Sequence, residues 1–298
     1  MHLHEHSTSA ITPRVACIVL NWNGGADTIS CLAALARISY PQMRVIVVDN
    51  GSTDDSVEKI REAFPDVAVL ASGKNLGFAK GNNLGIRFAL EEGADYIWLL
   101  NNDTEPTVDA LSQLVDIAES SGDVGAVGSI LMYASRPDDV QVWGGGRVNR
   151  WTGHSSYAIA PKPTSWFHFL CGASMLVRCS VFNAIGYLDE EFFLYWEDVE
   201  FGVRLTTKGW KLAIAPDSIV LHKVNASTRR ANMSGERYST TSGIRFLRKY
   251  SPLSWVSICI FLVGRCAKRV ALGQPKRVVS VYHGICDYIV SVRTQASA

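Results

Sequence analysis

Two acidic residues stand out because their surroundings suit chemistry better than simple solvation. Asp103 follows the apolar run 96–100, and Asp198 lies in the acidic and aromatic stretch 189–201. A carboxylate just beyond a buried strand can hold a divalent ion that bridges a diphosphate. Alternatively, Asp103 contributes to the N-terminus of a helix that we expect to begin with Thr104 as its cap. The residue alone does not decide between these roles.

The stretch 189–201 combines six carboxylates with five aromatic residues. A solvated helix would account for Glu197 and Asp198, because acidic residues favour a helix N-terminus. That explanation gives Tyr195 and Trp196 no role. We therefore favour a carboxylate base at the mouth of an aromatic-walled cleft, where partial desolvation raises its pKa towards the working pH.

Small polar residues follow three of the expected strands. Asn21, Asp49 and Asn102 come directly or almost directly after apolar runs. Ligands of open parallel sheets gather beyond the carboxyl ends of the strands, so these residues are candidates for binding one. An Asp in this position can accept hydrogen bonds from a base or ribose, although it is equally typical of a turn.

The stretch 75–83 has the composition of a phosphate-binding turn, with Asn75, Gly77, Lys80 and Asn82 leading into an expected helix. Backbone N–H groups, the helix dipole and the lysine could together face a phosphate. An ordinary glycine-rich turn is the competing interpretation. The chain has neither G-x-G-x-x-G nor a P-loop at its first turn, which argues against a dehydrogenase or a P-loop kinase.

The elements that must position these residues alternate in type. Over the first 130 residues, apolar runs at 15–20, 45–48, 67–70 and 96–100 are separated by segments with helical spacing. This order predicts an α/β fold with a mostly parallel, doubly wound sheet flanked by helices. From Val140 to Thr164, the shift to Gly, Pro and Trp predicts a long loop over one sheet edge.

The composition describes a folded chain of 298 residues, 47% hydrophobic and 19% charged. A net charge of +1 argues against a nucleic-acid binder. Seven cysteines without a C-x-x-C pair indicate a reducing, cytoplasmic compartment. Residues 1–13 contain no apolar signal-peptide core and are expected to form a flexible arm. The longest apolar run, 253–264, is shorter than the roughly 20 residues that cross a bilayer.

The C-terminal region differs from the rest in charge. Residues 244–286 hold eight Lys or Arg and no acid, and they flank an apolar run that contains Trp255, Ile258, Ile260, Phe261 and Leu262. This is typical of a helix that lies on an anionic membrane surface, such as the inner face of the cell membrane. A helical subdomain packed on the rest of the chain, or a homodimer contact, would give the same pattern.

Five segments occur in the order and spacing of glycosyltransferase family 2 motifs, and they most resemble its bacterial rhamnosyltransferase-like branch: 15–24, 47–54, 75–83, 99–104 and 196–201. The resemblance covers about Ala16 to Thr228. It implies a GT-A fold over 14–230, with a nucleotide-binding half at about 14–130 and an acceptor half at about 131–230. Residues 231–298 would form a basic, apolar helical extension.

The resemblance also implies a nucleoside-diphosphate sugar donor and Mn²⁺ or Mg²⁺. Asp103 would hold the metal together with His222, and Asp198 would be the base that activates the acceptor. Residues on the donor side would be Asn21, Asp49, Asn75, Gly77, Lys80, Asn82 and Asn102, with Asp49 at the base or ribose. Tyr195, Trp196 and Glu197 would lie on the acceptor side.

This sequence departs from the family pattern at two places. Asn101 replaces the first acid of the D-x-D metal motif and offers only a neutral oxygen, and Lys80 stands where relatives often have a small residue. The implied reaction is one displacement that inverts the anomeric centre, moving a sugar such as rhamnose to a hydroxyl on a lipid-linked or cell-surface glycan. The alternatives are a non-catalytic sugar-nucleotide sensor or scaffold, favoured by Asn101, and a nucleotidyltransferase, which would form pyrophosphate.

Overall fold

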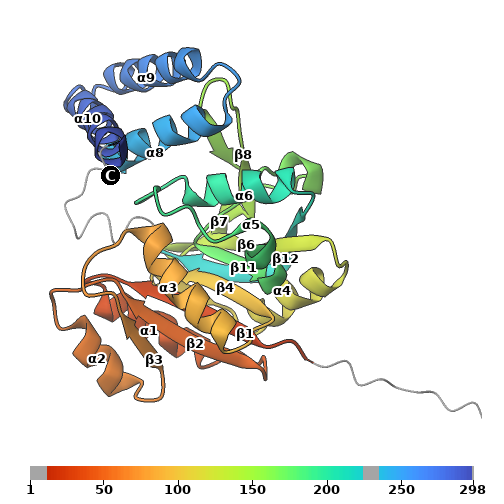
Figure 1. Cartoon of the computed structure of the whole chain (residues 1–298). Helices are drawn as coiled ribbons and strands as arrows, with labels where there is room; N and C mark the ends of the chain where they lie inside the picture. The colour runs from red at the N-terminus through yellow and green to blue at the C-terminus, as the bar shows by residue number, and fades with distance from the viewer. Residues whose placement is uncertain (1–11, 224–234, 297–298) are drawn as a thin grey trace, which may run out of the picture.

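The computed structural model describes residues 12–223 and 235–296. Residues 1–11 of the expected N-terminal arm lie outside this range, and so does the expected boundary at 230. The described chain has a layered α/β body, with a group of C-terminal helices stacked against one end of it (Figure 1).

The body is built on a main sheet of nine described strands in the order β3-β2-β1-β4-β11-β6-β12-β5, with β7 beside β6. These strands are β1 (Val15–Asn21), β2 (Met43–Asp49), β3 (Ala68–Ala71), β4 (Tyr96–Asn101), β5 (Thr104–Pro106), β6 (Val124–Tyr133), β7 (Arg136–Trp143), β11 (Ser174–Arg178) and β12 (Lys211–His222). The first four are parallel, as the βαβα order predicts. Strand β11 then runs antiparallel between β4 and β6.

Helices cover both faces of this sheet, which confirms the predicted doubly wound arrangement. They are α1 (Gly25–Leu35), α2 (Ser56–Ala63), α3 (Phe78–Glu91), α4 (Ala110–Glu119), α5 (Cys179–Ile185) and α6 (Glu197–Thr207). One core cluster joins Leu35 of α1 and Leu114 of α4 to the sheet. The other joins Ile86 of α3 and Phe201 of α6 to the opposite face. The apolar runs are therefore buried from both sides, as expected of parallel strands.

The segment after Asp103 differs from its prediction. Thr104 was expected to cap a helix, but Thr104–Pro106 forms β5 and pairs antiparallel with β12, with His222 opposite Thr104. Helix α4 begins only at Ala110. This pairing matters for the candidate site, because it fixes the end of β12 beside Asp103, the residue that precedes β5.

The region 140–164 was expected to be a long loop, and that prediction is wrong. It contains the end of β7, then β8 (Gly145–Val148) and β9 (Ser155–Tyr157), which form a second sheet with β10 (Phe169–Leu170). The glycines that favoured a loop are needed for close strand packing. A Cβ atom on Gly145 would lie 2.2 Å from the carbonyl oxygen of Phe169.

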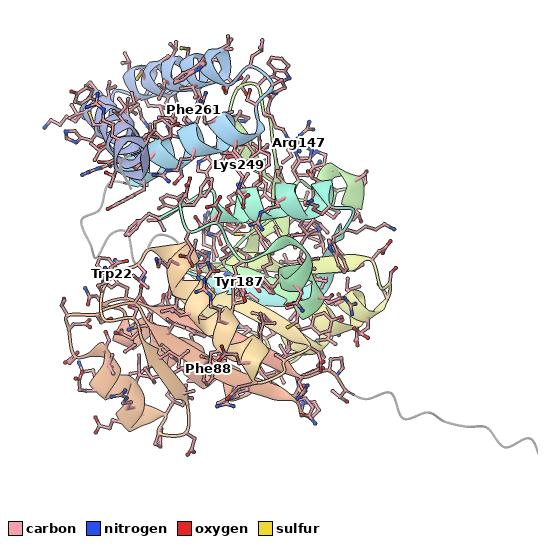
Figure 2. All side chains as sticks on the ribbon, viewed as in Figure 1. Trp22, Phe88, Arg147, Tyr187, Lys249 and Phe261 are labelled. Carbon is pink, nitrogen blue, oxygen red and sulfur yellow. The ribbon has the colours of Figure 1, made fainter. Side chains whose placement is uncertain are left out.

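Between residues 235 and 296 the structure describes three helices: α8 (Gly235–Tyr250), α9 (Ser254–Ala271) and α10 (Lys276–Ala296). They pack on the α/β body through the aromatic side chains of Trp196, Phe246 and Phe261. Figure 2 shows Phe261 between α9 and α8. In the described part of the chain, we find no helix with the length and apolarity that a membrane span requires.

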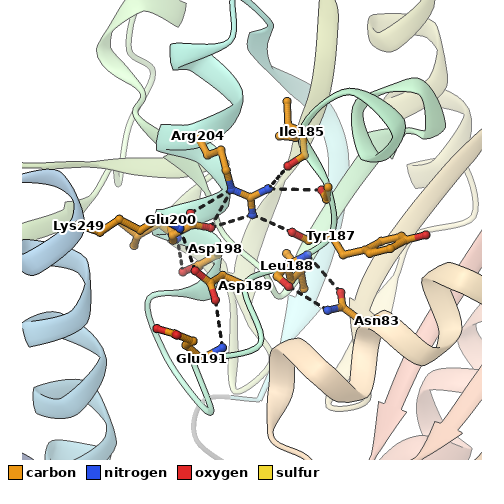
Figure 3. Close-up of polar contacts among 12 residues, drawn as sticks. Asn83, Ile185, Tyr187, Leu188, Asp189, Glu191, Asp198, Glu200, Arg204 and Lys249 are labelled. Atoms are coloured by element: carbon orange, nitrogen blue, oxygen red, sulfur yellow. Dashed lines mark hydrogen bonds and ion pairs between the residues drawn. The ribbon is translucent and has the colours of Figure 1, made fainter. Parts of the chain in front are cut away.

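An ionic network fastens α8 to α6 (Figure 3). The fully buried carboxylate of Glu200 accepts hydrogen bonds from Arg204 Nη2 at 2.8 Å, Lys249 Nζ at 2.8 Å and the Tyr250 hydroxyl at 2.6 Å. Burial acts to raise the pKa of Glu200, but Arg204 and the other donors bring it below its usual value. A buried carboxylate with this many partners holds the two helices in one relative position.

Candidate active site

A cavity of about 340 Å³ opens next to the carboxyl ends of β1 and β4. Asp103 and Asp198 both line it, although they come from distant parts of the chain. His222 and Glu197 line it as well. The sequence therefore identified four acidic or basic side chains that the fold brings to a single opening.

Asp103 and His222 form a pair in the cavity wall. The Nε2 atom of His222 lies 3.3 Å from Oδ1 of Asp103, and both side chains are largely buried. The β5–β12 pairing makes this contact possible, since the backbone N–H of Lys223 also donates to the Asp103 carbonyl at 2.9 Å. On the far side of the ring, His222 Nδ1 lies 2.9 Å from Gln141 Oε1. Sequence reasoning missed Gln141, because it lies in the supposed loop.

The donor set of this pair fits a divalent ion. When Nδ1 donates to Gln141 Oε1, Nε2 of His222 keeps its lone pair and can act as a ligand. One imidazole nitrogen and one carboxylate suit Mn²⁺ and leave positions for phosphate oxygens and water. Asn101 also lines the cavity. Within residues 12–223 and 235–296, however, no group of three or more His, Cys, Asp and Glu side chains forms a complete metal cage.

Asp198, which also lines the cavity, is held in a fixed orientation. It is the second residue of α6, and its Oδ2 accepts the Gly172 N–H at 3.1 Å while Oδ1 accepts the Val199 N–H at 2.8 Å. Burial raises the pKa of Asp198 above its usual value, and the two N–H donors act in the opposite direction. The result is an oriented carboxylate with increased proton affinity, which is what a general base requires.

Glu197, next to Asp198, differs in its hydrogen bonding. It is 6% exposed, and its Oε2 has no hydrogen-bond partner among the described residues. Burial and the adjacent Asp198 charge raise the pKa of Glu197 well above its usual value. Because two N–H groups stabilise the charge of Asp198 and none is seen at Glu197 Oε2, we infer that Glu197 is the member of the pair that keeps its proton.

Glu197→Gln should flatten the pH dependence of stability. The folded state of the native chain binds the Glu197 proton more tightly than the unfolded state does. The corresponding stabilisation is therefore complete below the unfolded pKa and is lost as pH rises through the raised folded pKa. Gln carries no such proton. In urea unfolding from about pH 5 to 9, the free energy of unfolding of the variant should therefore rise relative to that of the native chain, by up to about 1.4 kcal/mol per pH unit.

The control for this measurement is Glu191→Gln, which changes a half-exposed acid in the same segment. That variant should keep the pH slope of the native chain. A stability difference between Glu197→Gln and the native chain that stays constant across the pH range would show that Glu197 does not retain a proton in the folded state.

The backbone before α6 has an unusual conformation. Tyr195 and Trp196 are successive non-glycine residues in the left-handed region, with φ of 67° and 72°. Such residues cluster at functional sites and persist only where surrounding contacts enforce them. Tyr195 lines the cavity, and its acceptor-side role stays a prediction.

Trp196 does not line the cavity, and here the structure corrects the expectation of an acceptor-side wall. Its indole is buried against Phe246, with ring centroids 5.1 Å apart, and against the edge of Phe261 at 6.1 Å. Trp196 therefore connects the C-terminal helices to the start of α6, where Glu197 and Asp198 lie. The aromatic side chains that do line the cavity include Trp22, Phe78, Tyr157, Phe193 and Tyr195.

Three of the predicted donor-side residues line the cavity: Asn75, Gly77 and Asn102. Gly77 has φ of 82°, and a Cβ atom there would lie 2.4 Å from the Phe193 carbonyl oxygen. Glycine is thus required where the start of α3 meets the segment that leads to α6. Asn50, which sequence reasoning did not single out, binds this turn by accepting the Leu76 N–H at 2.9 Å and donating to the Gly77 carbonyl at 3.1 Å.

The other four predicted donor-side residues do not line this cavity. Asn21 and Asp49 are buried and bond to each other, with Asn21 Nδ2 3.0 Å from Asp49 Oδ1. Asn82 donates to the Phe78 carbonyl at 3.0 Å. Lys80 pairs with Glu190 at 3.3 Å rather than facing the cavity. Asn21, Asp49 and Asn82 thus shape the turns around the site, and a phosphate contact by Lys80 would require that ion pair to open.

The sheet topology is that of the GT-A type of glycosyltransferase fold. Residues 16–186, more than half of the chain, match the family model "Glycosyl transferase family 2". The chain belongs to this family and is a glycosyltransferase of the hexosyltransferase type.

Relatives support the same assignment. The chain is 28% identical over 246 residues to N-acetylglucosaminyl-diphospho-decaprenol L-rhamnosyltransferase of Mycobacterium tuberculosis, an alignment that covers 74% of this chain and 79% of the relative. Rhamnosyltransferase WbbL of Escherichia coli is 23% identical over 80% of this chain and 94% of its own. A mannosyltransferase of Pyrobaculum calidifontis, solved with GDP-Man and Mn²⁺, shares the fold, with a TM-score of 0.59, 17% identity and coverage of 97% and 81%.

Proposed function

We propose that this glycosyltransferase moves a sugar, with inversion, from a nucleoside-diphosphate donor to an acceptor hydroxyl in a metal-dependent reaction. The observation that carries the proposal is that the Asp103–His222 pair and Asp198 line the same cavity. The cavity can thus hold a cation beside a diphosphate and also present an oriented base. The nucleotide half would comprise about residues 14–130 and the acceptor half about 131–230.

The residues then divide the reaction between them. Asp103 and His222 would hold Mn²⁺ or Mg²⁺, which when bound neutralises charge that develops on the departing diphosphate. Asn75, Asn102 and the backbone of Gly77 would orient the donor. Asp198 would take the proton of the acceptor hydroxyl as its oxygen attacks the anomeric carbon from the face opposite the leaving group. One displacement of this kind inverts the anomeric centre.

The sugar and the acceptor are proposed from the relatives. Three relatives are named rhamnosyltransferases, which favours a rhamnosyl donor. The name of the mycobacterial relative also gives its acceptor, N-acetylglucosaminyl-diphospho-decaprenol. The aromatic side chains in the cavity wall suit stacking against a sugar ring, because a sugar presents C–H groups on its faces. We therefore propose a glycan acceptor carried on lipid.

The test is product analysis with purified protein, Mn²⁺ and dTDP-, UDP- and GDP-sugars. A glycosyltransferase should release nucleoside diphosphate from one donor and, with acceptor, form a glycoside of inverted configuration. A sugar-nucleotide sensor would raise the melting temperature with its ligand but release nothing. Pyrophosphate as product would instead indicate nucleotidyl transfer, and a product of retained configuration would contradict the single displacement.

A further inference from the structure

Helix α9 has two apolar faces, and residues 12–223 and 235–296 cover only one of them. Ile258 and Phe261 point inward and are 6% and 5% exposed. Four aliphatic residues at helical spacing lie on the opposite side and are 47% to 69% exposed: Val256, Ile260, Val263 and Val270. A helix that is apolar on both sides is ordinarily buried, so the outer face requires a partner. In Figure 1, α9 is the helix farthest from the main sheet.

Helix α10 continues the apolar character of this region. Val279, Tyr282 and Val290 recur at helical spacing and are 54% to 63% exposed. At the start of α9, Trp255 is 65% exposed, and the guanidinium of Arg248 lies 4.9 Å from its ring centroid. An exposed indole beside a cation suits the boundary between water and lipid, where one part of the ring is apolar and the other is polar.

The charge of this region selects the kind of partner. Residues 244–286 contain eight basic residues and no acid. Four of the eight bond to acidic side chains of the molecule: Arg245, Lys249, Arg265 and Arg269. The other four are exposed and have no ion pair in the described part of the chain: Arg248, Lys268, Lys276 and Arg277. The outer surface therefore combines uncovered aliphatic groups with uncompensated positive charge.

We propose that the outer surface of α9 and α10 docks on an anionic lipid membrane, with Val256, Ile260 and Val263 entering the interface. The four exposed cations would meet lipid phosphates, as basic residues do beside interfacial helices. A second copy of the chain fits less well. A symmetric dimer would bring two basic surfaces together, and residues 244–286 supply no acid to pair with them.

Helix α8, on which α9 and α10 pack, lies against the cavity wall. Tyr238 of α8 stacks on Phe193 with ring centroids 5.1 Å apart, and Ser242 Oγ donates to the Leu194 carbonyl at 3.0 Å. Phe193, Leu194 and Tyr195 line the cavity. Docking would thus bring a lipid-carried hydroxyl towards the wall that the proposed function assigns to the acceptor. This last step rests on that function, whereas the docking itself does not.

The experiment is co-sedimentation of the full chain with vesicles, in the absence of donor and acceptor. Vesicles of phosphatidylcholine with about one third phosphatidylglycerol should bind the chain at least about tenfold more strongly than pure phosphatidylcholine, and added salt should weaken binding. Val263→Asp should reduce binding at least about tenfold, because it places a charge in the apolar face. Lys276→Glu should reduce it about fivefold or more.

The matched control is Val108→Asp, which changes a 51% exposed valine between β5 and α4. It should bind vesicles as the native chain does, and all three variants should keep the native melting temperature. No binding by the native chain at low salt would overturn the proposal, as would equal losses for Val108→Asp and Val263→Asp. Sedimentation equilibrium tests the alternative that a second copy of the chain covers this surface. If the native chain forms a dimer that Val263→Asp dissociates, and if it does not bind vesicles, the surface serves self-association and lipid docking is refuted. Donor cleavage is measured separately, so failure of the transfer reaction leaves this test intact.

Discussion

Asp198→Asn should lower the rate of sugar transfer by about 10²- to 10⁴-fold, the usual contribution of a general base. Affinity for the donor should remain near that of the native chain, because Asp103, His222 and the Asn75–Gly77 turn are unchanged. Asn has the size of Asp but cannot accept the proton of the acceptor hydroxyl. Product formation measured beside donor binding by calorimetry separates the two effects.

The hydrogen bonds of Asp198 mean that Asp198→Asn can also lower the stability of the fold, so its stability must be measured. The carboxylate accepts one N–H at each oxygen, from Gly172 and Val199. An Asn amide can accept only one of them and places its own donor against the other, which is expected to cost about 1–3 kcal/mol. Melting curves must therefore accompany the kinetics. Loss of transfer in a folded variant that still binds donor supports the assignment, and normal turnover would refute it.

The pH profile gives an independent check on the same residue. Burial raises the pKa of Asp198, so this carboxyl holds its proton to a higher pH than an exposed aspartate does. Only the ionised form can act as base. Transfer by the native chain should therefore fall as pH decreases through the raised pKa, and the residual activity of Asp198→Asn should lack this acidic limb.

The sequence carried much of the information about the fold because its strands are buried on both faces. Such strands are continuous apolar runs, and 15–20 and 96–100 were placed correctly for that reason. Strand β5 could not be predicted in this way. Three residues that end in Pro106 resemble the start of a helix, and only the distant β12 makes them a strand.

Residue type was enough to predict which three ionisable side chains would come together. Asp103, His222 and Asp198 are chemically distinctive, and the structure brings all three to one cavity. Trp196 was misplaced because a composition of mixed acids and aromatics does not tell which rings face a cavity and which face another helix. The direction in which each ring points depends on the left-handed backbone at Tyr195 and Trp196, which the local sequence pattern does not predict.

On the proposed mechanism, Asp103→Ala should abolish the stimulation of sugar transfer by divalent metal. A bound metal contributes several kcal/mol to charge stabilisation, so transfer should fall by about 10²-fold or more even at high Mn²⁺. A second readout needs no activity: Mn²⁺ with nucleoside diphosphate should raise the melting temperature of the native chain, and this shift should disappear in the variant. His222→Ala should show a smaller loss, since it removes a neutral ligand and keeps the anionic one.

The control for the metal site is Asp123→Asn, a surface acid that pairs with Lys211 at the start of β12. It should retain both the Mn²⁺ shift and full transfer. An unchanged Mn²⁺ shift in Asp103→Ala would place the metal elsewhere and remove the reason for pairing Asp103 with His222. Because Asn101 already supplies only a neutral oxygen at this edge of the sheet, Asp103 is the one carboxylate we assign to the ion, and its removal should leave too little negative charge to retain a divalent cation.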